Sequence, residues 1–103
     1  MIRHIAIFKL KDSQNGQSKA DNVSQIKRNV EKLRENINTI KVIQAQENFH
    51  DSSALFPADD LCVLADFETR ADYDFYFNHP VHKEAAHFAG AVSEYVHGIT
   101  YEV

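Results

Sequence analysis

Hydrophobic and polar residues follow two different spacings along the chain, and these spacings predict its secondary structure. Residues 2–10 alternate as in a strand, with apolar side chains on both faces in the middle. From about Ala20 the apolar positions follow steps of three and four. This spacing predicts an amphipathic helix whose buried stripe is Val23, Ile26, Val30, Leu33 and Ile37. The polar segment 11–19 contains the turn signal Asn15-Gly16 and is predicted to be a loop.

Two strands are predicted to follow this helix, which Ser18 or Asp21 should cap at its start. Residues 40–51 have weak strand character and become polar in their second half, as expected of an edge strand. Residues 61–68 form the most apolar strand pattern, which is typical of a central strand. The segment 51–60 between them is predicted to be a loop.

The last third of the chain predicts two short helices and a final strand. Thr69 resembles an N-cap, and the helix that it starts should end at Asn78-His79-Pro80, because proline cannot continue a helix but suits the first turn of a new one. Residues 94–103 alternate again. The second of these helices has apolar positions at helical spacing: Val81, Ala85, Phe88 and Val92.

This order of elements is β-α-β-β-α-β, the ferredoxin-like pattern of an α+β protein, with its second helix broken in two. The length suits a single domain, 1–103. Both faces of the first strand are apolar, and helices can cover only one of them. We therefore expect a second subunit to cover the other face.

Composition narrows the class of protein further. The chain is 44% hydrophobic and 25% charged, as in a soluble globular protein, and its scattered basic residues and net charge of -4 argue against a nucleic-acid partner. Cys62 is the single cysteine, lies in an apolar run and is interpreted as a buried, inert thiol. The sequence starts directly with a strand pattern and has no apolar stretch of membrane-spanning length. We therefore expect a cytoplasmic location and no membrane partner.

The residues with the clearest chemical potential gather at the proline break. Tyr76, His79 and His82 are each three apart, and a helix places such pairs on adjoining faces. Two interpretations stay open. The three side chains can line a functional site, or His79 and Asn78 only cap the helix junction while Tyr76 belongs to the core.

A metal site and a paired-carboxylate site are both disfavoured by the sequence. His4, His79 and His82 would suit zinc, copper or iron as ligands, but two histidines astride a proline break are poorly set to share a metal. We predict no metal. The acidic residues Asp59, Asp60, Asp72 and Asp74 are interpreted as turn and helix-cap residues.

The opening RHIAIFKLK, the strand end Phe67-Glu68-Thr69 and the YxxHPxH run over residues 76–82 resemble the stress-responsive dimeric α/β-barrel (Dabb) domain family. The resemblance spans essentially the whole chain. It implies a homodimer in which two four-stranded sheets pack face to face into a barrel. It also implies a small cleft between the sheet and the broken helix of each subunit.

In plant members of that family, the cleft serves a polyketide cyclisation, with a tyrosine and a histidine of this run as the acid/base pair. By position, the resemblance implies His82 as the base that removes a proton next to a carbonyl and Tyr76 as the oxyanion donor. No cofactor is implied. The residues expected to contact a small apolar or aromatic ligand are His4, Phe8, Val63, His79 and Phe88.

The sequence therefore supports two classes of function. The first is an aldol-type lyase or cyclase that acts on a small ketone-bearing or phenolic compound, and a less favoured variant is a cofactor-free monooxygenase on the same barrel. The second is a non-enzymatic dimer that is stress-related or binds a ligand. The state of His82 discriminates between them. A buried His82 bonded to the backbone is structural, whereas one that faces an open cleft is available for chemistry.

Overall fold

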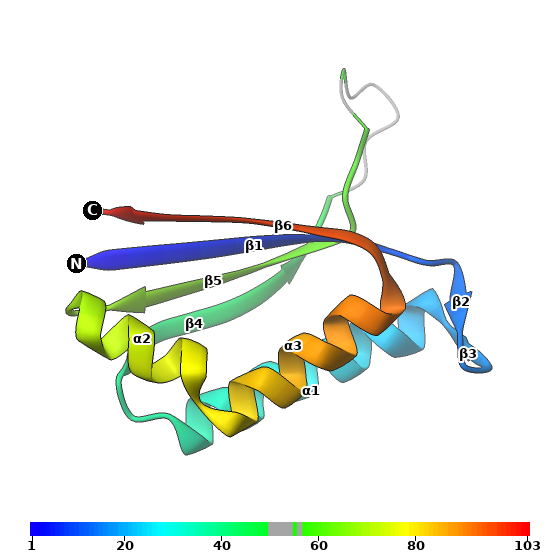
Figure 1. Cartoon of the computed structure of the whole chain (residues 1–103). Coiled ribbons are helices and arrows are strands. Elements are labelled where there is room, and N and C mark those ends of the chain that lie inside the picture. Colours follow the sequence, from blue (N-terminus) through cyan, green and yellow to red (C-terminus); the bar gives the residue numbers. More distant parts are fainter. Residues whose placement is uncertain (50–54, 56) are drawn as a thin grey trace.

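The computed structural model describes residues 1–49, 55 and 57–103. In this part of the chain, an antiparallel sheet of strand order β4-β5-β1-β6 carries all the long helices on one face (Figure 1). The ferredoxin-like α+β order predicted from the sequence is confirmed. The elements are β1 (Ile2–Leu10), β2 (Ser13–Gln14), β3 (Gln17–Ser18), α1 (Lys19–Asn36), β4 (Ile40–Glu47), β5 (Leu61–Phe67), α2 (Arg70–Asn78), α3 (Pro80–Val92) and β6 (Ser93–Glu102).

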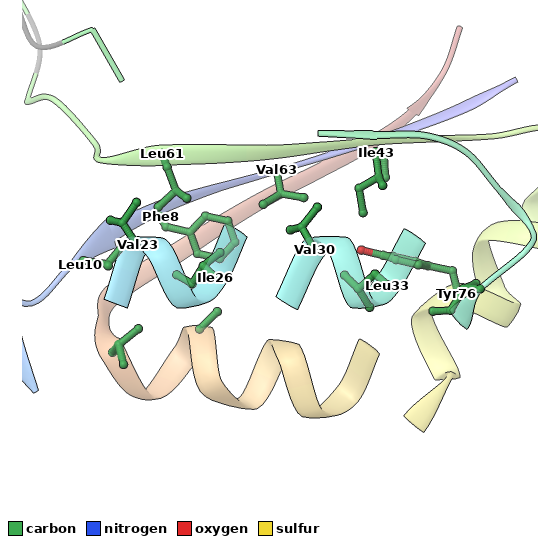
Figure 2. Close-up of a cluster of buried hydrophobic side chains, with 14 of the residues drawn as sticks. Phe8, Leu10, Val23, Ile26, Val30, Leu33, Ile43, Leu61, Val63 and Tyr76 are labelled. Atoms are coloured by element: carbon green, nitrogen blue, oxygen red, sulfur yellow. The ribbon is translucent and has the colours of Figure 1, made fainter. Parts of the chain in front are cut away.

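The core lies between the sheet and α1, because the alternating residues of the strands meet the apolar stripe of this helix (Figure 2). The stripe is the one predicted from the sequence, and each of its members is buried. The strand residues that pack against it include Phe8, Leu10, Ile43, Leu61, Val63, Ala65 and Phe67. The central position of β5 is confirmed, and so is the edge position of β4.

The segment before α1 differs from its prediction. Residues 11–19 were expected to be a loop, but they contain the short hairpin β2–β3. Asn15 and Gly16 both have positive φ, 55° and 74°, as a tight two-residue hairpin turn requires. Ser18 then caps α1 by accepting a hydrogen bond from the Asp21 backbone N–H at 3.1 Å. Of the two residues proposed for this cap, Ser18 is therefore the one that fills the position.

The predicted break between α2 and α3 is confirmed, and His79 forms it. Its backbone is extended, with φ −69° and ψ 138°, and its Nδ1 accepts a hydrogen bond from the Val81 N–H at 3.1 Å. Pro80 occupies the first helical position, where its missing N–H costs nothing. At the other end of α2, Thr69 accepts from the Asp72 N–H at 3.1 Å, which confirms its role as N-cap.

The predicted strand 40–51 is too long, since β4 ends at Glu47 and Asn48 and Phe49 follow without strand structure. Residues 50 and 51 lie outside the described residues. The predicted start of the last strand is within one residue of β6. No helix in the described ranges is both long and apolar enough to cross a membrane.

The face of the sheet opposite the helices carries apolar side chains that no described element covers (Figure 1). Ile7 is 37% exposed, Ile99 59% and Tyr101 41%. Cys62, expected to be a buried thiol, lies half-buried on this face. Within the same face Arg3 donates two hydrogen bonds to Asp66, from Nε at 2.8 Å and from a terminal nitrogen at 2.9 Å. We call this surface the open sheet face.

Candidate functional site

A pocket of about 360 Å³ lies between the helix-facing side of the sheet and α1, α2 and α3. It brings together His4 from β1, Tyr76 from α2 and His82 from the first turn of α3. The other lining residues are mostly apolar or small: Ala6, Phe8, Ile26, Asn29, Val30, Leu33, Val63, Phe77, Ala85, Ala86, Ala89, Gly90, Val96 and Gly98. Three polar aromatic groups in an apolar cavity of this size are typical of a small-molecule site.

One ring nitrogen of His82 makes a hydrogen bond within the chain, and the other is available to a ligand. Its Nδ1 lies 3.0 Å from the Phe77 carbonyl oxygen. Because a carbonyl can only accept, Nδ1 must carry the proton of this hydrogen bond, and in the neutral ring Nε2 is left with its lone pair. The backbone of α2 therefore fixes the tautomer that can accept a proton at Nε2.

Tyr76 is the most deeply buried of the three, with 3% of its surface exposed. Its ring packs against His82 with centroids 4.4 Å apart and against Phe67 at 4.8 Å. Among the described residues, none shares a hydrogen bond with its hydroxyl. Burial, with a smaller contribution from the nearby Tyr73, raises the pKa of Tyr76 well above the ordinary tyrosine value. The hydroxyl is thus a donor that stays protonated.

His4 reaches the pocket from the middle of the sheet, and its position follows from the register of β1. Its Nδ1 lies 2.7 Å from the Thr100 hydroxyl on the neighbouring strand β6. Its ring contacts Tyr73 at a centroid distance of 5.5 Å. A Cβ at Gly98, also on β6, would lie 3.5 Å from His4 Cε1, which is an ordinary van der Waals contact, so Gly98 lies directly beside the ring.

Burial lowers the pKa of both histidines below the ordinary value of 6.5. For His4, repulsion from a charge on His82 lowers the pKa further, so the two rings interact electrostatically. For His82, the hydrogen bond to Phe77 partly offsets the effect of burial. Both imidazoles are accordingly neutral at pH 7, the form in which a histidine can act as a base.

Two of the residues expected to contact a ligand are not in this pocket. His79 is outside the lining, and its Nδ1 accepts the Val81 N–H as the cap of α3. Phe88 lines a different pocket, between α1 and α3. A ligand contact of either residue stays a prediction. The structure brings the remaining sequence candidates together in one lining: His4, Phe8, Val63, Tyr76 and His82.

Sequence reasoning missed the residues that shape the mouth of the pocket. Phe77 and Val96 are exposed there, together with the small residues Ala86, Gly90 and Gly98. The signal for Val96 and Gly98 was present, because they alternate with the residues of β6 assigned to its other face. Only the pairing of Phe8 with Val96 and of Ala6 with Gly98 shows that this second face meets the pocket.

The three-histidine metal site weighed from the sequence is not formed. No group of three histidine, cysteine, aspartate or glutamate side chains comes together among the residues that the structure describes. The Nδ1 of His79 accepts a hydrogen bond from the Val81 backbone N–H.

The fold and the pocket define a class of protein: a small ferredoxin-like α+β subunit with an apolar, histidine-containing pocket between its sheet and its helices. Residues 2–103 match the model of the stress responsive A/B barrel domain, Dabb. The chain belongs to this family.

Solved structures share the fold at low sequence identity. A dimeric ferredoxin-like protein of unknown function from Bacteroides fragilis is 24% identical, with a TM-score of 0.82, over 99% of this chain and 95% of that chain. A dimeric ferredoxin-like protein of unknown function from Thermobifida fusca is also 24% identical, with a TM-score of 0.80, over 99% of this chain and 90% of that chain. The hydroxynitrile lyase of Passiflora edulis is 17% identical, with a TM-score of 0.85, over 99% of this chain and 92% of that chain. No curated protein matches the chain.

Proposed function

We propose that this protein is a homodimer that binds a small ketone-bearing or phenolic compound in the pocket and catalyses an aldol-type proton transfer and ring closure on it. The observation that carries the proposal is the hydrogen bond from His82 Nδ1 to the Phe77 carbonyl, because it leaves the lone pair of Nε2 available on a ring that lines an apolar pocket and packs against the Tyr76 ring. One relative by fold is described as a hydroxynitrile lyase, so lyase chemistry occurs on this fold.

In the proposed reaction, His82 Nε2 takes a proton from the carbon next to a carbonyl group. The enolate oxygen that forms accepts a hydrogen bond from the Tyr76 hydroxyl. The carbanion equivalent then attacks a second carbonyl carbon of the same molecule, so that one carbon–carbon bond forms. The new alkoxide takes back the proton from His82. His4 positions the substrate, and no cofactor takes part in this sequence.

The residues fit these roles because each is held in the form that it needs. A base must be neutral at working pH, and burial lowers the pKa of His82. An oxyanion donor must keep its proton, and burial raises the pKa of Tyr76. The apolar lining of Phe8, Val63 and Leu33 suits an aromatic or aliphatic substrate.

The test is the exchange of the methyl protons of acetophenone for deuterium, followed by NMR in heavy water. The native protein should accelerate exchange, and His82→Gln should slow it by about 10²–10⁴-fold because it removes the base. Tyr76→Phe should slow it by about 10²–10³-fold because it removes the oxyanion donor. His87→Gln is the matched control, since His87 lies on the same helix but is exposed and outside the pocket. Equal rates for the native protein and His82→Gln would refute the catalytic role.

A non-enzymatic, ligand-binding dimer is the second candidate, and one observation favours it. His82 is bonded to the backbone and Tyr76 is packed in the core, so both residues also stabilise the fold. Acetophenone that binds in the pocket without any exchange of its protons would support this candidate. The cytoplasmic location and the link to stress stay predictions from the sequence.

The homodimer is proposed from the open sheet face. A four-stranded sheet with helices on one side leaves Ile7, Ile99 and Tyr101 exposed on the other, and a second copy would remove them from water. The dimeric state of the fold's relatives from Bacteroides fragilis and Thermobifida fusca supports the proposal.

A further inference from the structure

The candidate pocket contains one more polar side chain, which the proposed reaction does not use. Asn29 lies on α1, three residues after Ile26, and both residues line this pocket. The other polar residues of the lining are His4, Tyr76 and His82, and each of them already has a role. Among the described residues that line the pocket, Asn29 is therefore the polar residue that has no role in the proposed reaction.

The orientation of the Asn29 amide follows from a chain of hydrogen bonds along α1. Arg28 donates to Gln25 Oε1 at 2.8 Å. Because a guanidinium can only donate, Gln25 must present its oxygen to Arg28. The nitrogen of Gln25, Nε2, donates to Asn29 Oδ1 at 2.9 Å. The oxygen of Asn29 is thus engaged, and its nitrogen Nδ2 is left as a donor.

The Asn29 nitrogen is unpaired and accessible. Within the described part of the chain, Nδ2 has no hydrogen-bond partner. The buried side-chain atoms without a partner belong to Asn22 and Ser93, so Asn29 Nδ2 is not one of them. Gln25 lines only the pocket between α1 and α3 that Phe88 lines, whereas Asn29 lines both pockets. With its oxygen turned to Gln25, the amide offers its nitrogen to the candidate pocket.

The second half of the proposed ring closure needs such a donor. Tyr76 donates to the enolate oxygen, but the carbonyl group that is attacked also develops negative charge on its oxygen. A carboxamide N–H is a neutral donor of the kind that stabilises an oxyanion. Asn29 comes from α1, whereas Tyr76 comes from α2. The two donors therefore approach a bound molecule from different elements.

We propose that Asn29 Nδ2 donates a hydrogen bond to the second carbonyl oxygen of the substrate, which is therefore a dicarbonyl compound. This inference rests on the proposed function. His82 removes a proton from the carbon next to the first carbonyl, and that carbon bonds to the second carbonyl carbon. The C=O π bond opens to an alkoxide, which accepts the hydrogen bond from Asn29. The alkoxide then takes the proton back from His82, so the reaction is an isomerisation without a co-reactant.

The experiment follows 1-phenylhexane-1,5-dione in heavy water by NMR. Exchange of its methyl protons for deuterium measures proton removal. Formation of 3-hydroxy-3-phenylcyclohexanone, or of the enone that it gives by loss of water, measures ring closure. In Asn29→Leu, the ratio of closure to exchange should fall by about 10²–10³-fold, the effect of removing one oxyanion donor. Asn29→Asp should lower the ratio similarly, because its carboxylate can accept from Gln25 but cannot donate.

Asn38→Leu is the matched control, since Asn38 is an exposed amide outside the pocket, and its ratio should equal that of the native protein. His82→Gln should slow exchange and closure together, because both need the base. An unchanged ratio in Asn29→Leu, or exchange by the native protein without any closure, would overturn this inference and leave proton removal by His82 standing. Absence of both processes would overturn the proposed function and, with it, this role of Asn29.

Binding gives a second readout that needs no turnover. The monoketone 6-phenylhexan-2-one has the same carbon chain but lacks the second carbonyl oxygen. In His82→Gln, which consumes the dione slowly, the dione should bind about fivefold more tightly than the monoketone, the difference expected for one hydrogen bond. When Asn29→Leu is added, the two compounds should bind alike. Equal affinities while Asn29 is present would contradict the proposed donor.

Discussion

His4 and His82 are kept neutral by their surroundings. Each ring is half-buried among apolar and aromatic side chains, where a positive charge would lose its hydration. The pKa of each is lowered mainly for this reason. A neutral imidazole can accept a proton. The pocket therefore supplies two potential bases at pH 7.

The same shifts predict how stability depends on pH. The unfolded chain binds protons on these two histidines at a higher pH than the folded chain does, because the folded pKa values are lower. The free energy of unfolding should therefore fall as the pH drops below about 6.5. In His82→Gln, whose side chain does not titrate, this pH dependence should be shallower. Denaturant unfolding at a series of pH values and one protein concentration measures it.

At pH 7, His82→Gln should lower the free energy of unfolding by about 1 kcal/mol, because the Phe77 carbonyl loses its donor. The control is His87→Gln, on the exposed side of α3, which should leave the stability at pH 7 unchanged. Parallel pH curves for the native protein and His82→Gln would contradict the lowered pKa of His82.

The junction of α2 and α3 sets the position of the site residues. The His79 side chain accepts a hydrogen bond from the Val81 N–H. The backbone N–H of His79 donates to the Tyr76 carbonyl at 3.1 Å. The chain therefore leaves one helix and enters the next within a single residue. This tight turn places His82 beside Tyr76, with ring centroids 4.4 Å apart.

Replacement of His79 tests this role. His79→Ala should lower the free energy of unfolding by about 1 kcal/mol, because α3 loses its cap, and His79→Asp should recover most of the loss because aspartate is a strong N-cap residue. Both variants should still bind acetophenone, since His79 does not line the pocket. Chemical denaturation measures the first effect and ligand NMR the second. If the well-folded His79→Asp variant lost acetophenone binding, His79 would have to be counted among the ligand-binding residues.

Long elements could be predicted from the sequence, and short ones could not. The stripe of α1 and the alternation of β1 each extend over several turns or residue pairs, so their periodicity is clear. The two-residue strands β2 and β3 are too short to show any period, and only the Asn15-Gly16 turn signalled the hairpin. The pocket that Phe88 lines could not be predicted, because helical spacing shows which residues share a face, but not which of two neighbouring pockets that face meets.

The candidate site was predictable only where its residues lie close together in the sequence. Tyr76 and His82 lie six residues apart, so the sequence itself places them close together. The mouth residues Val96 and Gly98 lie far along the chain from His4, and they reach it only through the register of β1 with β6. The tautomer of His82 also depends on structure, because a carbonyl of the preceding helix selects it.

At the scale of the whole molecule, the open sheet face is a surface that no described element of the chain covers. Ile5 of β1 pairs with Ile99 of β6, and these residues share the face with the ion pair of Arg3 and Asp66. Arg3 lowers the pKa of the Asp66 carboxyl chiefly through their hydrogen bonds. Because the pair is already formed within the chain, a second subunit could cover it without leaving either charge alone.

Ile99→Asp should convert the proposed dimer into a monomer. The substitution places an unpaired carboxylate in each of two symmetry-related positions, and burial of such a charge costs several kcal/mol per ion. Light scattering coupled to size exclusion gives the mass. Phe75→Asp is the control, because Phe75 is similarly exposed, at 52%, but lies on a helix. A native protein that is monomeric at all concentrations, or a dimeric Ile99→Asp, would contradict this interface.

The hydrogen bond between His82 and the Phe77 carbonyl has a consequence for control of the site. The protonated imidazole also carries a hydrogen on Nδ1, so both charge states make the same bond. Mild acid should therefore remove only the lone pair of Nε2 and leave the ring where it is. The pocket would be switched off and on by acidity without any rearrangement of its walls, and recovery after neutralisation would be as fast as proton transfer itself.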